Sequence, residues 1–276
     1  MAWTLLRAIL ITYLIVLALL WIFQTHLIYF PSSARAAELD TAARDRGLEP
    51  WLLADGTAAG WCSRGTGNAW VVFHGNAGFA LHRTHFVAML RAADPDASVY
   101  IFEYPGYGAR PGPPSEGRIA TAAVAAVQDL AANRGGKIIL IGESIGASFA
   151  ARVAERMGGR VGALLLITPF DRLANVAAYH YPFIMPVRWI LRERHDTAAA
   201  LGSYRGRAAI LVAEHDSVVP RRFGEALHRG LICDKRLWLI HGADHNEHDR
   251  SNEIFSQRNL PQKNGVTAKK HDREKQ

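Results

Sequence analysis

The chain has 276 residues, 49% of them apolar and 21% charged, which is typical of a globular protein and long enough for one sizeable core. The formal net charge is +7, but six basic and three acidic side chains from Ser251 to Gln276 supply +3 of it, and no aromatic-interleaved basic patch accounts for the rest, which argues against a nucleic acid partner. Cys62 and Cys233 are far apart and have no metal-ligand spacing, so a disulfide framework is excluded and one bridge stays open.

The N-terminal segment is strongly apolar. From Ala8 to Phe23 it reads AILITYLIVLALLWIF, without a charge, and approaches the ~20 residues that a helix needs to cross a bilayer. The bulky sequence QTHLIYFP follows in place of a small-residue cleavage site, which favours an uncleaved anchor over a signal peptide. Trp21, Tyr29 and Phe30 suit an interfacial belt, although Tyr29 and Phe30 could equally pack against the following domain.

The charges on either side of this segment indicate an orientation. Arg7 and the terminal amine precede the apolar run, whereas Arg35, Arg44 and Arg46 follow it at a greater distance. The positive-inside rule therefore weakly favours a cytoplasmic N-terminus and a translocated domain. We expect a single-pass membrane protein.

After the anchor, short apolar runs alternate with helix-like stretches. EPWLLADGTAAGWCSRG predicts a hairpin that turns at Asp55-Gly56. Strands are expected at the apolar runs that begin at Ala69 and Ser98 and at Ile138–Ile141, Ala163–Ile167, Ala208–Ala213 and Arg236–Ile240. Helices are expected at Leu81–Ala93, Ser115–Asn133, Ile145–Met157 and Arg221–Arg229. This order predicts an α/β fold, with a mainly parallel, doubly wound sheet covered on both faces.

One segment interrupts this alternation. Residues 171–205 contain YHYPFIMPVRWILRERHD, with two prolines and many bulky side chains. We expect a small cap over the C-terminal edge of the sheet, and the alternative is an ordinary connector helix with a longer loop. The predicted organisation is an anchor over 1–30, a domain over 31–250 and a charged, disordered tail over 251–276.

The sequence KIILIGESIGASFA carries the clearest chemical signal. A branched apolar run ends in Gly-x-Ser-x-Gly, and a stretch of small residues follows. A strand that turns directly into a helix strains the residue at the junction, and Gly142 and Gly146 would supply the clearance. The turn would expose the Ser144 hydroxyl beside the backbone N–H groups of a helix N-terminus.

A serine nucleophile needs a base, and the base needs a group that orients it. Asp216 follows one later apolar run and His245 follows the next, so the chain order is Ser, Asp, His. Asp216 could instead only cap the following helix, in which case Glu214 or Asp171 would be the acid.

Three histidines lie close together after the last predicted strand. His241, His245 and His248 could be read as a metal cluster, but their irregular loop spacing is a poor match for one. His245 is the best placed base, because Gly242 and Ala243 let the loop turn back. His241 is expected at the strand end and His248 in a final helix.

A tetrahedral intermediate also needs hydrogen-bond donors for its oxyanion. We expect one from the backbone N–H of Ile145, directly after the serine. The second is assigned to the backbone N–H of Asn76 in VVFHGNAG, with Ala77 as the alternative. His74 is expected to fix this loop.

Six motifs, HGNAG, EYPGYGARPGPPSE, GESIGA, TPFDRL, HDSVVP and GADHNE, occur in this order along the chain. With the preceding apolar segment and LIYFP, the chain resembles the membrane-anchored α/β-hydrolase family, which includes eukaryotic protein depalmitoylases and many bacterial members. The resemblance implies an α/β-hydrolase fold and a serine hydrolase without a cofactor, with Ser144 as nucleophile, Asp216 as orienting acid and His245 as base. The basic segment around HYPFIMPVRWILRERHD and the tail after Asn252 depart from the family pattern.

The expected reaction is cleavage of an ester or thioester through an acyl-serine. The expected partners are a small-molecule or acylated substrate and membrane lipid, and no oligomeric state is predicted. The side chains of Leu173, Phe183, Ile184, Met185 and Trp189 could line an acyl pocket or be simple core residues. The alternatives are a non-catalytic, membrane-tethered binding protein and a serine peptidase.

Overall fold

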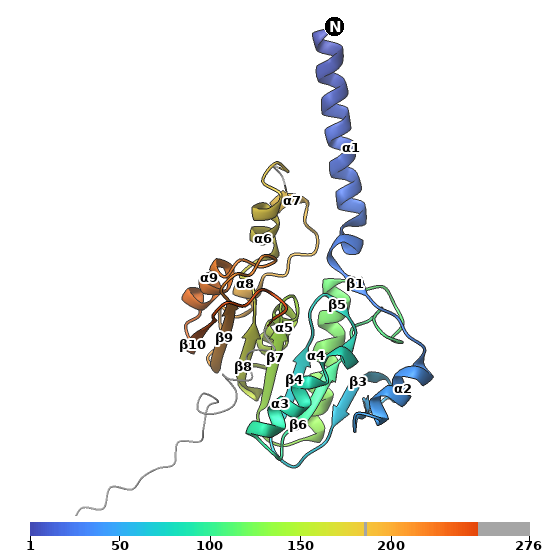
Figure 1. Cartoon of the computed structure of the whole chain (residues 1–276), viewed down its shortest axis with the longest axis vertical. Coiled ribbons are helices and arrows are strands. Elements are labelled where there is room, and N and C mark those ends of the chain that lie inside the picture. The colour runs from blue at the N-terminus through green and yellow to red at the C-terminus, as the bar shows by residue number, and fades with distance from the viewer. Residues whose placement is uncertain (185–186, 248–276) are drawn as a thin grey trace, which may run out of the picture.

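The structure is a computed structural model that describes residues 1–184 and 187–247. It begins with a long helix, α1 (Ala2–Ile28), which projects away from the rest of the chain (Figure 1). By length and composition α1 can cross a membrane, and none of its most apolar stretch is buried. A signal sequence would have the same features, so anchoring and orientation remain predictions.

The domain is built on one sheet of eight strands. In the order of the sheet the strands are β10 (Asp234–Ile240), β9 (Arg207–Ala213), β8 (Val161–Ile167), β7 (Ile138–Glu143), β4 (Ala69–Phe73), β6 (Ser98–Phe102), β3 (Ala58–Ser63) and β2 (Glu49–Leu52). β3 runs antiparallel to both of its neighbours, and all other neighbours are parallel. The predicted α/β fold is confirmed, as is the hairpin, in which Gly56 has a φ of 80°.

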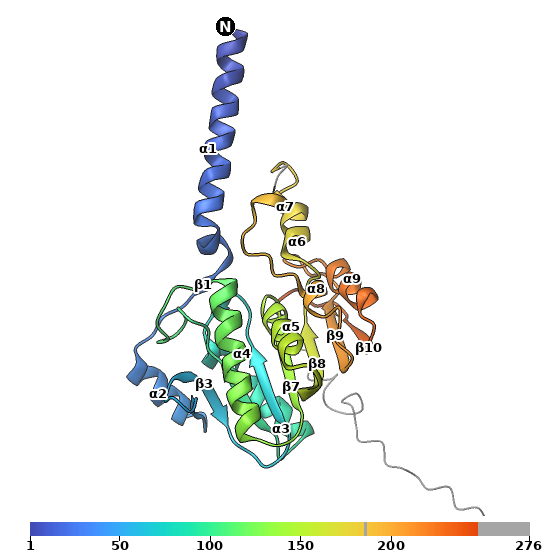
Figure 2. The same cartoon turned by 180° about the vertical axis from the view of Figure 1, so that it is seen from behind.

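Helices cover both faces of the sheet. α2 (Ala36–Arg44), the 3-10 helix η1 (Ala80–Arg83) and α3 (His85–Ala93) pack on one face, and α4 (Glu116–Asn133), α5 (Gly146–Met157) and α9 (Arg222–Gly230) on the other (Figures 1 and 2). In β4, Val71 and Phe73 belong to one hydrophobic cluster and Trp70 and Val72 to the other. This burial on both faces explains why the strands read as continuous apolar runs.

Two 3-10 helices were not predicted. The single helix expected from Leu81 to Ala93 is divided into η1 and α3 at Thr84. A second 3-10 helix, η2 (Gly158–Arg160), follows α5. The division after Arg83 lets its side chain turn back toward Glu143, as described below.

Residues 171–205 hold three short helices, α6 (Leu173–His180), α7 (Val187–Ile190) and α8 (Thr197–Ala200). The segment is therefore not a plain crossover helix. α6 and α7 rise from the same end of the domain as α1 (Figures 1 and 2). This is the end at which the parallel strands reach their carboxyl termini.

The chain leaves α1 and joins the domain at once. β1 (Phe30–Pro31) pairs in parallel with β5 (Ala77–Gly78), and the N–H of Phe30 donates to the carbonyl of Asn76 at 3.0 Å. Tyr29 is buried, with only 2% of its surface exposed, whereas Phe30 is half exposed. Of the two positions that the sequence left open for Tyr29, packing against the domain is the one that the structure shows.

Candidate active site

Ser144 lies at the turn between β7 and α5. Its φ of 53° is in the left-handed region that side chains other than glycine rarely adopt. The N–H of Ser144 donates to the carbonyl of Ile167 in β8 at 2.8 Å, so the strained turn is tied to the neighbouring strand. A Cβ at Gly142 would overlap the backbone of Ala147, and one at Gly146 would overlap carbonyl oxygens at the end of β4. Both glycines therefore provide the predicted clearance.

Replacing Gly146 by Ala is expected to lower the free energy of unfolding by about 1–3 kcal/mol, because the new methyl group meets the Phe73 and His74 carbonyls. Thermal or denaturant unfolding of the full chain in detergent measures the change. Gly117→Ala is the matched control, since a Cβ there has no heavy atom within 4 Å. In helix α4 this control should be neutral or should stabilise by up to about 1 kcal/mol. Equal effects of the two changes would contradict the packing argument.

The structure brings Ser144, Asp216 and His245 together from three strand ends. His245 Nε2 lies 3.0 Å from the Oγ of Ser144, and His245 Nδ1 lies 2.9 and 2.8 Å from the two carboxylate oxygens of Asp216. Asp216 and His245 are both buried, with 7% of each exposed. A base that a carboxylate holds within hydrogen-bond reach of a hydroxyl can activate that hydroxyl as a nucleophile.

Asp216 and His245 are held by their own loops. The carboxylate of Asp216 accepts the N–H groups of Val218 and Val219 at 3.0 and 2.6 Å. Asp244 accepts the N–H of Ser217 at 2.8 Å and that of His245 at 2.7 Å, and these hydrogen bonds, Ser217 first, lower the pKa of the Asp244 carboxyl. Asp244 thus connects the acid loop to the base loop. Sequence reasoning missed it, although it stands within the motif GADHNE.

The other candidate acids lie elsewhere. Glu214 accepts the N–H of Gly242 at 2.9 Å and lies 3.3 Å from exposed His241, directly after β10. Asp171 accepts the side-chain amide of Asn175 at 2.6 Å. His248 falls outside the described residues. Among the described candidate acids and bases, His245 contacts Ser144, and Asp216 contacts His245.

The two predicted oxyanion donors flank the serine turn. In the described part of the chain, the backbone N–H groups of Asn76 and Ile145 donate to no other residue. The tight packing of Gly146 on Phe73 and His74 brings the start of α5 against the loop that carries Asn76. The assignment itself stays a prediction. His74 is fully buried and stacks on Tyr104 with ring centroids 3.9 Å apart, and the Tyr104 hydroxyl donates to its carbonyl, which fits a role in fixing the loop.

A buried ion pair lies directly beneath the serine turn. The guanidinium of Arg83, in η1, donates two hydrogen bonds to the carboxylate of Glu143, one of them 2.8 Å long. The side chain of Glu143 is 4% exposed and that of Arg83 is 18% exposed. Glu143 also borders Gly75, so the pair connects the nucleophile strand to the loop that carries Asn76. The sequence indicated neither this pairing nor a role for Glu143.

A model of the alpha/beta hydrolase family matches residues 70–251, which includes all three residues of the Ser-His-Asp arrangement. The chain belongs to the alpha/beta hydrolase family.

Two relatives resemble this hydrolase in sequence. An uncharacterized protein of Mycobacterium tuberculosis strain H37Rv is 33% identical over 243 residues, 84% of each chain. The alpha/beta hydrolase domain-containing protein WAV2 of Arabidopsis thaliana is 27% identical over 54% of this chain and 53% of its own.

Solved structures share the fold at low sequence identity. The Pyrococcus furiosus esterase PF2001 has a TM-score of 0.63 at 16% identity and covers 83% of the hydrolase and 95% of its own chain. The monoacylglycerol lipase of Paleococcus ferrophilus has a TM-score of 0.55 at 18% identity, over 70% and 93%. At these identities the comparison shows the fold.

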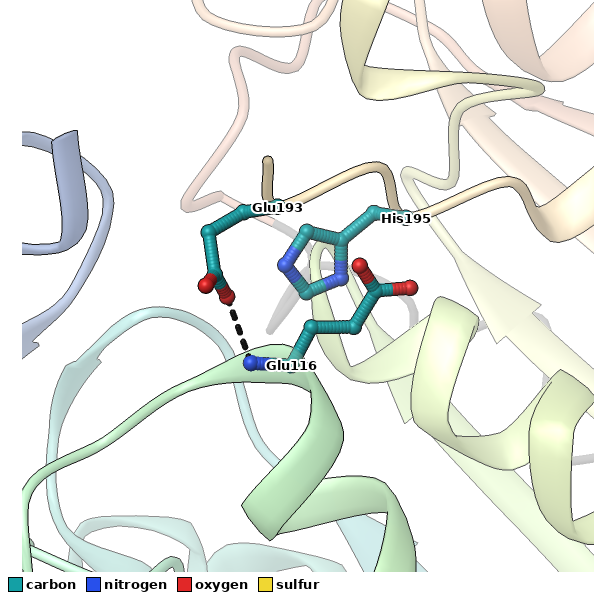
Figure 3. A group of neighbouring side chains, drawn as sticks. All are labelled: Glu116, Glu193 and His195. Carbon is teal, nitrogen blue, oxygen red and sulfur yellow. Dashed lines mark hydrogen bonds between the residues drawn. The ribbon is translucent and has the colours of Figure 1, made fainter. Parts of the chain in front are cut away.

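A second polar cluster lies where α1, α4, α5 and the insertion meet in the hydrolase. We call it the buried joint, and it consists of Tyr29, Glu116, Ser148, Glu193 and His195. Figure 3 shows Glu193 and His195 above the start of α4, with the Glu193 carboxylate accepting the N–H of Glu116. The Tyr29 hydroxyl lies 2.7 Å from Glu193 and 2.9 Å from His195 Nε2, and the hydroxyl of Ser148 lies 2.7 Å from His195 Nδ1.

Two carboxylates and an imidazole within 4.8 Å of one another are possible metal ligands. In the hydrolase, however, both ring nitrogens of His195 already have hydroxyl partners in Tyr29 and Ser148. The Tyr29 hydroxyl donates its proton to the Glu193 carboxylate, because a hydrogen bond to a charged acceptor is the stronger one. It then accepts a hydrogen bond from His195 Nε2–H. The buried joint is therefore a satisfied polar network that fastens Tyr29 to the insertion.

The buried joint makes the stability of the hydrolase pH-dependent. Burial lowers the pKa of His195 from 6.5 to about 4, against the opposing effect of Glu193. Between pH 6.5 and pH 4 the unfolded chain binds a proton at His195 that the folded chain does not. Neutral His195 therefore destabilises nothing above pH 6.5, and the free energy of unfolding falls as the pH decreases toward 4. The expected loss is about 3 kcal/mol in the free energy of unfolding. Denaturant unfolding at pH values from 7.5 to 4 measures this. The free energy of unfolding of His195→Gln should fall less than that of the parent, and that of the exposed His241→Gln should fall as much as that of the parent.

The remaining predictions for the hydrolase concern cysteines and a pocket. Cys62 and Cys233 are free thiols, so the bridge left open by the sequence does not form. Phe183 and Trp189 are 72% and 86% exposed, so neither of the positions that the sequence left open for them, an acyl pocket under the cap or the core, is correct. They lie on the outside of the insertion, while Leu173 packs partly against the core and Met185 falls outside the described residues.

Proposed function

We propose that the protein is a serine hydrolase that cleaves an ester or thioester, with Ser144 as nucleophile, His245 as general base and Asp216 as orienting acid. The observation that carries the proposal is the continuous contact from Asp216 through His245 to the strained, partly exposed serine. The esterase and the lipase among the structural neighbours are consistent with it.

In the proposed mechanism, His245 Nε2 takes the proton of the Ser144 hydroxyl as its oxygen attacks the substrate carbonyl. Asp216 accepts the hydrogen bond from His245 Nδ1, which keeps the tautomer whose Nε2 is a free base and stabilises the imidazolium that forms. The amides of Asn76 and Ile145 would hold the oxyanion. His245 then returns the proton to the leaving alcohol or thiol, and a water activated by the same base releases the acid and restores Ser144.

We also propose that α1 is an uncleaved single-pass anchor, with the N-terminus on the cytoplasmic side. Its length, its apolar composition and the bulky residues after it support this. An anchor that enters the domain at the site would bring the serine close to acylated or lipid-linked substrates, as in the depalmitoylase-like family that the motifs resemble. Long acyl chains would then be preferred over soluble substrates.

Labelling with a fluorophosphonate probe tests the nucleophile. The full chain in detergent should gain one adduct by intact mass, and Ser144→Ala should gain none. Ser203→Ala, which removes an exposed serine, should label like the parent. A folded parent without an adduct would refute the proposed serine hydrolase activity. The alternative to pursue would then be that the protein is a membrane-tethered binding protein.

A further inference from the structure

The insertion carries large aromatic side chains on its outer surface. Tyr181, Phe183 and Trp189 are 51%, 72% and 86% exposed. Tyr181 and Phe183 follow α6, with ring centroids 6.3 Å apart, and Trp189 lies in α7. We call these three residues the aromatic tip. Soluble proteins seldom leave such side chains clustered in water, and a cluster of this kind marks a surface that contacts another apolar phase.

The insertion is fastened to the end of α1. The amide of Gln24 donates to the carbonyl of Ile190 at 3.3 Å and its oxygen accepts the N–H of Arg192 at 2.7 Å, although Gln24 belongs to a helix that is otherwise exposed and apolar. The guanidinium of Arg192 lies 4.6 Å from the centroid of the Trp21 ring. The end of α7 is therefore held at the level of Trp21 and Gln24, where the apolar run of α1 ends.

A second attachment fixes the direction in which the insertion faces. The hydroxyl of Tyr29, directly after α1, is hydrogen-bonded to Glu193 and His195 in the buried joint. With one attachment on each side of the turn that ends α1, the insertion and α1 leave the domain at the same end (Figures 1 and 2). A bilayer crossed by α1 would meet the aromatic tip as well.

The charges around the tip favour an anionic surface. Arg188, Arg192 and Arg194 are exposed, whereas Glu193 between them is buried in the joint. Tryptophan and tyrosine prefer the headgroup level of a bilayer, and nearby arginines bind anionic headgroups.

We propose that the aromatic tip inserts into the headgroup region of the bilayer that α1 crosses, so that the face of the domain bearing Ser144 lies against the membrane. This rests on the proposed anchoring of α1, but not on hydrolysis. The occupant of the tip is then an anionic lipid surface rather than a second copy of the chain, because α1 already places the tip at that surface.

Depth-dependent quenching tests the proposal on the full chain. A cysteine is introduced at Phe183, at Leu14 within α1 or at Ala132 at the far end of α4, and is labelled with a polarity-sensitive fluorophore. The background carries Cys233→Ser, and its remaining thiol, Cys62, is fully buried. The proteins are reconstituted into phosphatidylcholine–phosphatidylglycerol vesicles that contain nitroxide-labelled lipids. We expect strong quenching at positions 14 and 183 and none at 132.

The three positions separate the possible failures. Quenching at 14 but not at 183 would overturn the inference and leave the anchor in place, and concentration-dependent cross-linking through position 183 would then indicate a second copy. Absence of quenching at both would overturn the inference together with the anchor. Neither result bears on Ser144, because fluorophosphonate labelling reports on the serine independently.

Hydrolysis provides a second measurement. Phe183→Ser combined with Trp189→Ser should lower the rate on an ester embedded in vesicles at least about tenfold, because the domain loses apolar contact with the bilayer. The rate on a short, water-soluble ester should stay unchanged. Ile232→Ser, which removes a 59% exposed apolar residue before β10, is the matched control and should change neither rate. An equal loss on both esters would contradict a role of the tip at the membrane.

Discussion

Replacing Asp216 by Asn is expected to lower kcat on a soluble ester by about 10⁴-fold with little change in folding, which is the effect of this change in Ser-His-Asp proteases. The Asn side chain can occupy the same place, but its amide donates to His245 Nδ1 where the carboxylate accepted. His245 would then carry its proton on Nε2, the atom that has to accept the proton of Ser144. Initial rates with p-nitrophenyl butyrate measure the effect.

Glu214→Gln is the matched control for this experiment. Glu214 follows the same strand, β9, but its carboxylate contacts Gly242 and His241. We expect its kcat to stay within a few-fold of the parent. A larger loss for Glu214→Gln than for Asp216→Asn would reverse the assignment of the acid, and unchanged activity in both would show that His245 needs no carboxylate.

The buried pair of Arg83 and Glu143 is expected to have the largest effect on stability. Arg83→Met would leave the carboxylate of Glu143 beneath the serine turn without its guanidinium and lower the free energy of unfolding by about 3–5 kcal/mol. Chemical unfolding of the full chain in detergent measures this. Arg118→Met, in the exposed first turn of α4, should change the free energy by less than about 0.5 kcal/mol.

The double variant Arg83→Met, Glu143→Met separates two explanations. If the cost arises from an uncompensated charge, removing that charge as well should restore most of the stability lost in Arg83→Met. A double variant that loses as much as the sum of the single changes would show that the two side chains act through separate contacts.

The predictable part of the site follows from the parallel sheet. Ser144 stands directly after β7, and Asp216 and His245 lie in the short loops after β9 and β10. Parallel strands bring such positions to one edge of the sheet whatever their separation along the chain. The strained turn at Ser144 was predictable because Gly142 and Gly146 flank it, and a strand that turns directly into a helix needs small residues at these positions. Strand positions were found well, since burial on both faces makes each strand a continuous apolar run.

The contacts that escaped prediction join distant segments through single polar atoms. Tyr29 and Glu193 are 164 residues apart, and neither stands in a motif that indicates the other. Tyr29 was ambiguous because an aromatic ring with a hydroxyl suits a membrane interface and a polar core equally well. Arg83 belongs to a stretch that the sequence predicts as one helix. Its pairing with Glu143 depends on the position of η1, which the sequence did not indicate.

Asn76 links the proposed chemistry to α1. Its carbonyl accepts the N–H of Phe30, and its side-chain amide donates to the carbonyl of Ile28, the last residue of α1. The backbone N–H of this same residue is the one proposed to hold the oxyanion. A movement of α1 would reach the proposed oxyanion donor through these two hydrogen bonds. With α1 as the proposed anchor, bilayer thickness and tension would be expected to change the rate of the proposed reaction, and a fragment cut free of α1 should differ in rate from the full chain.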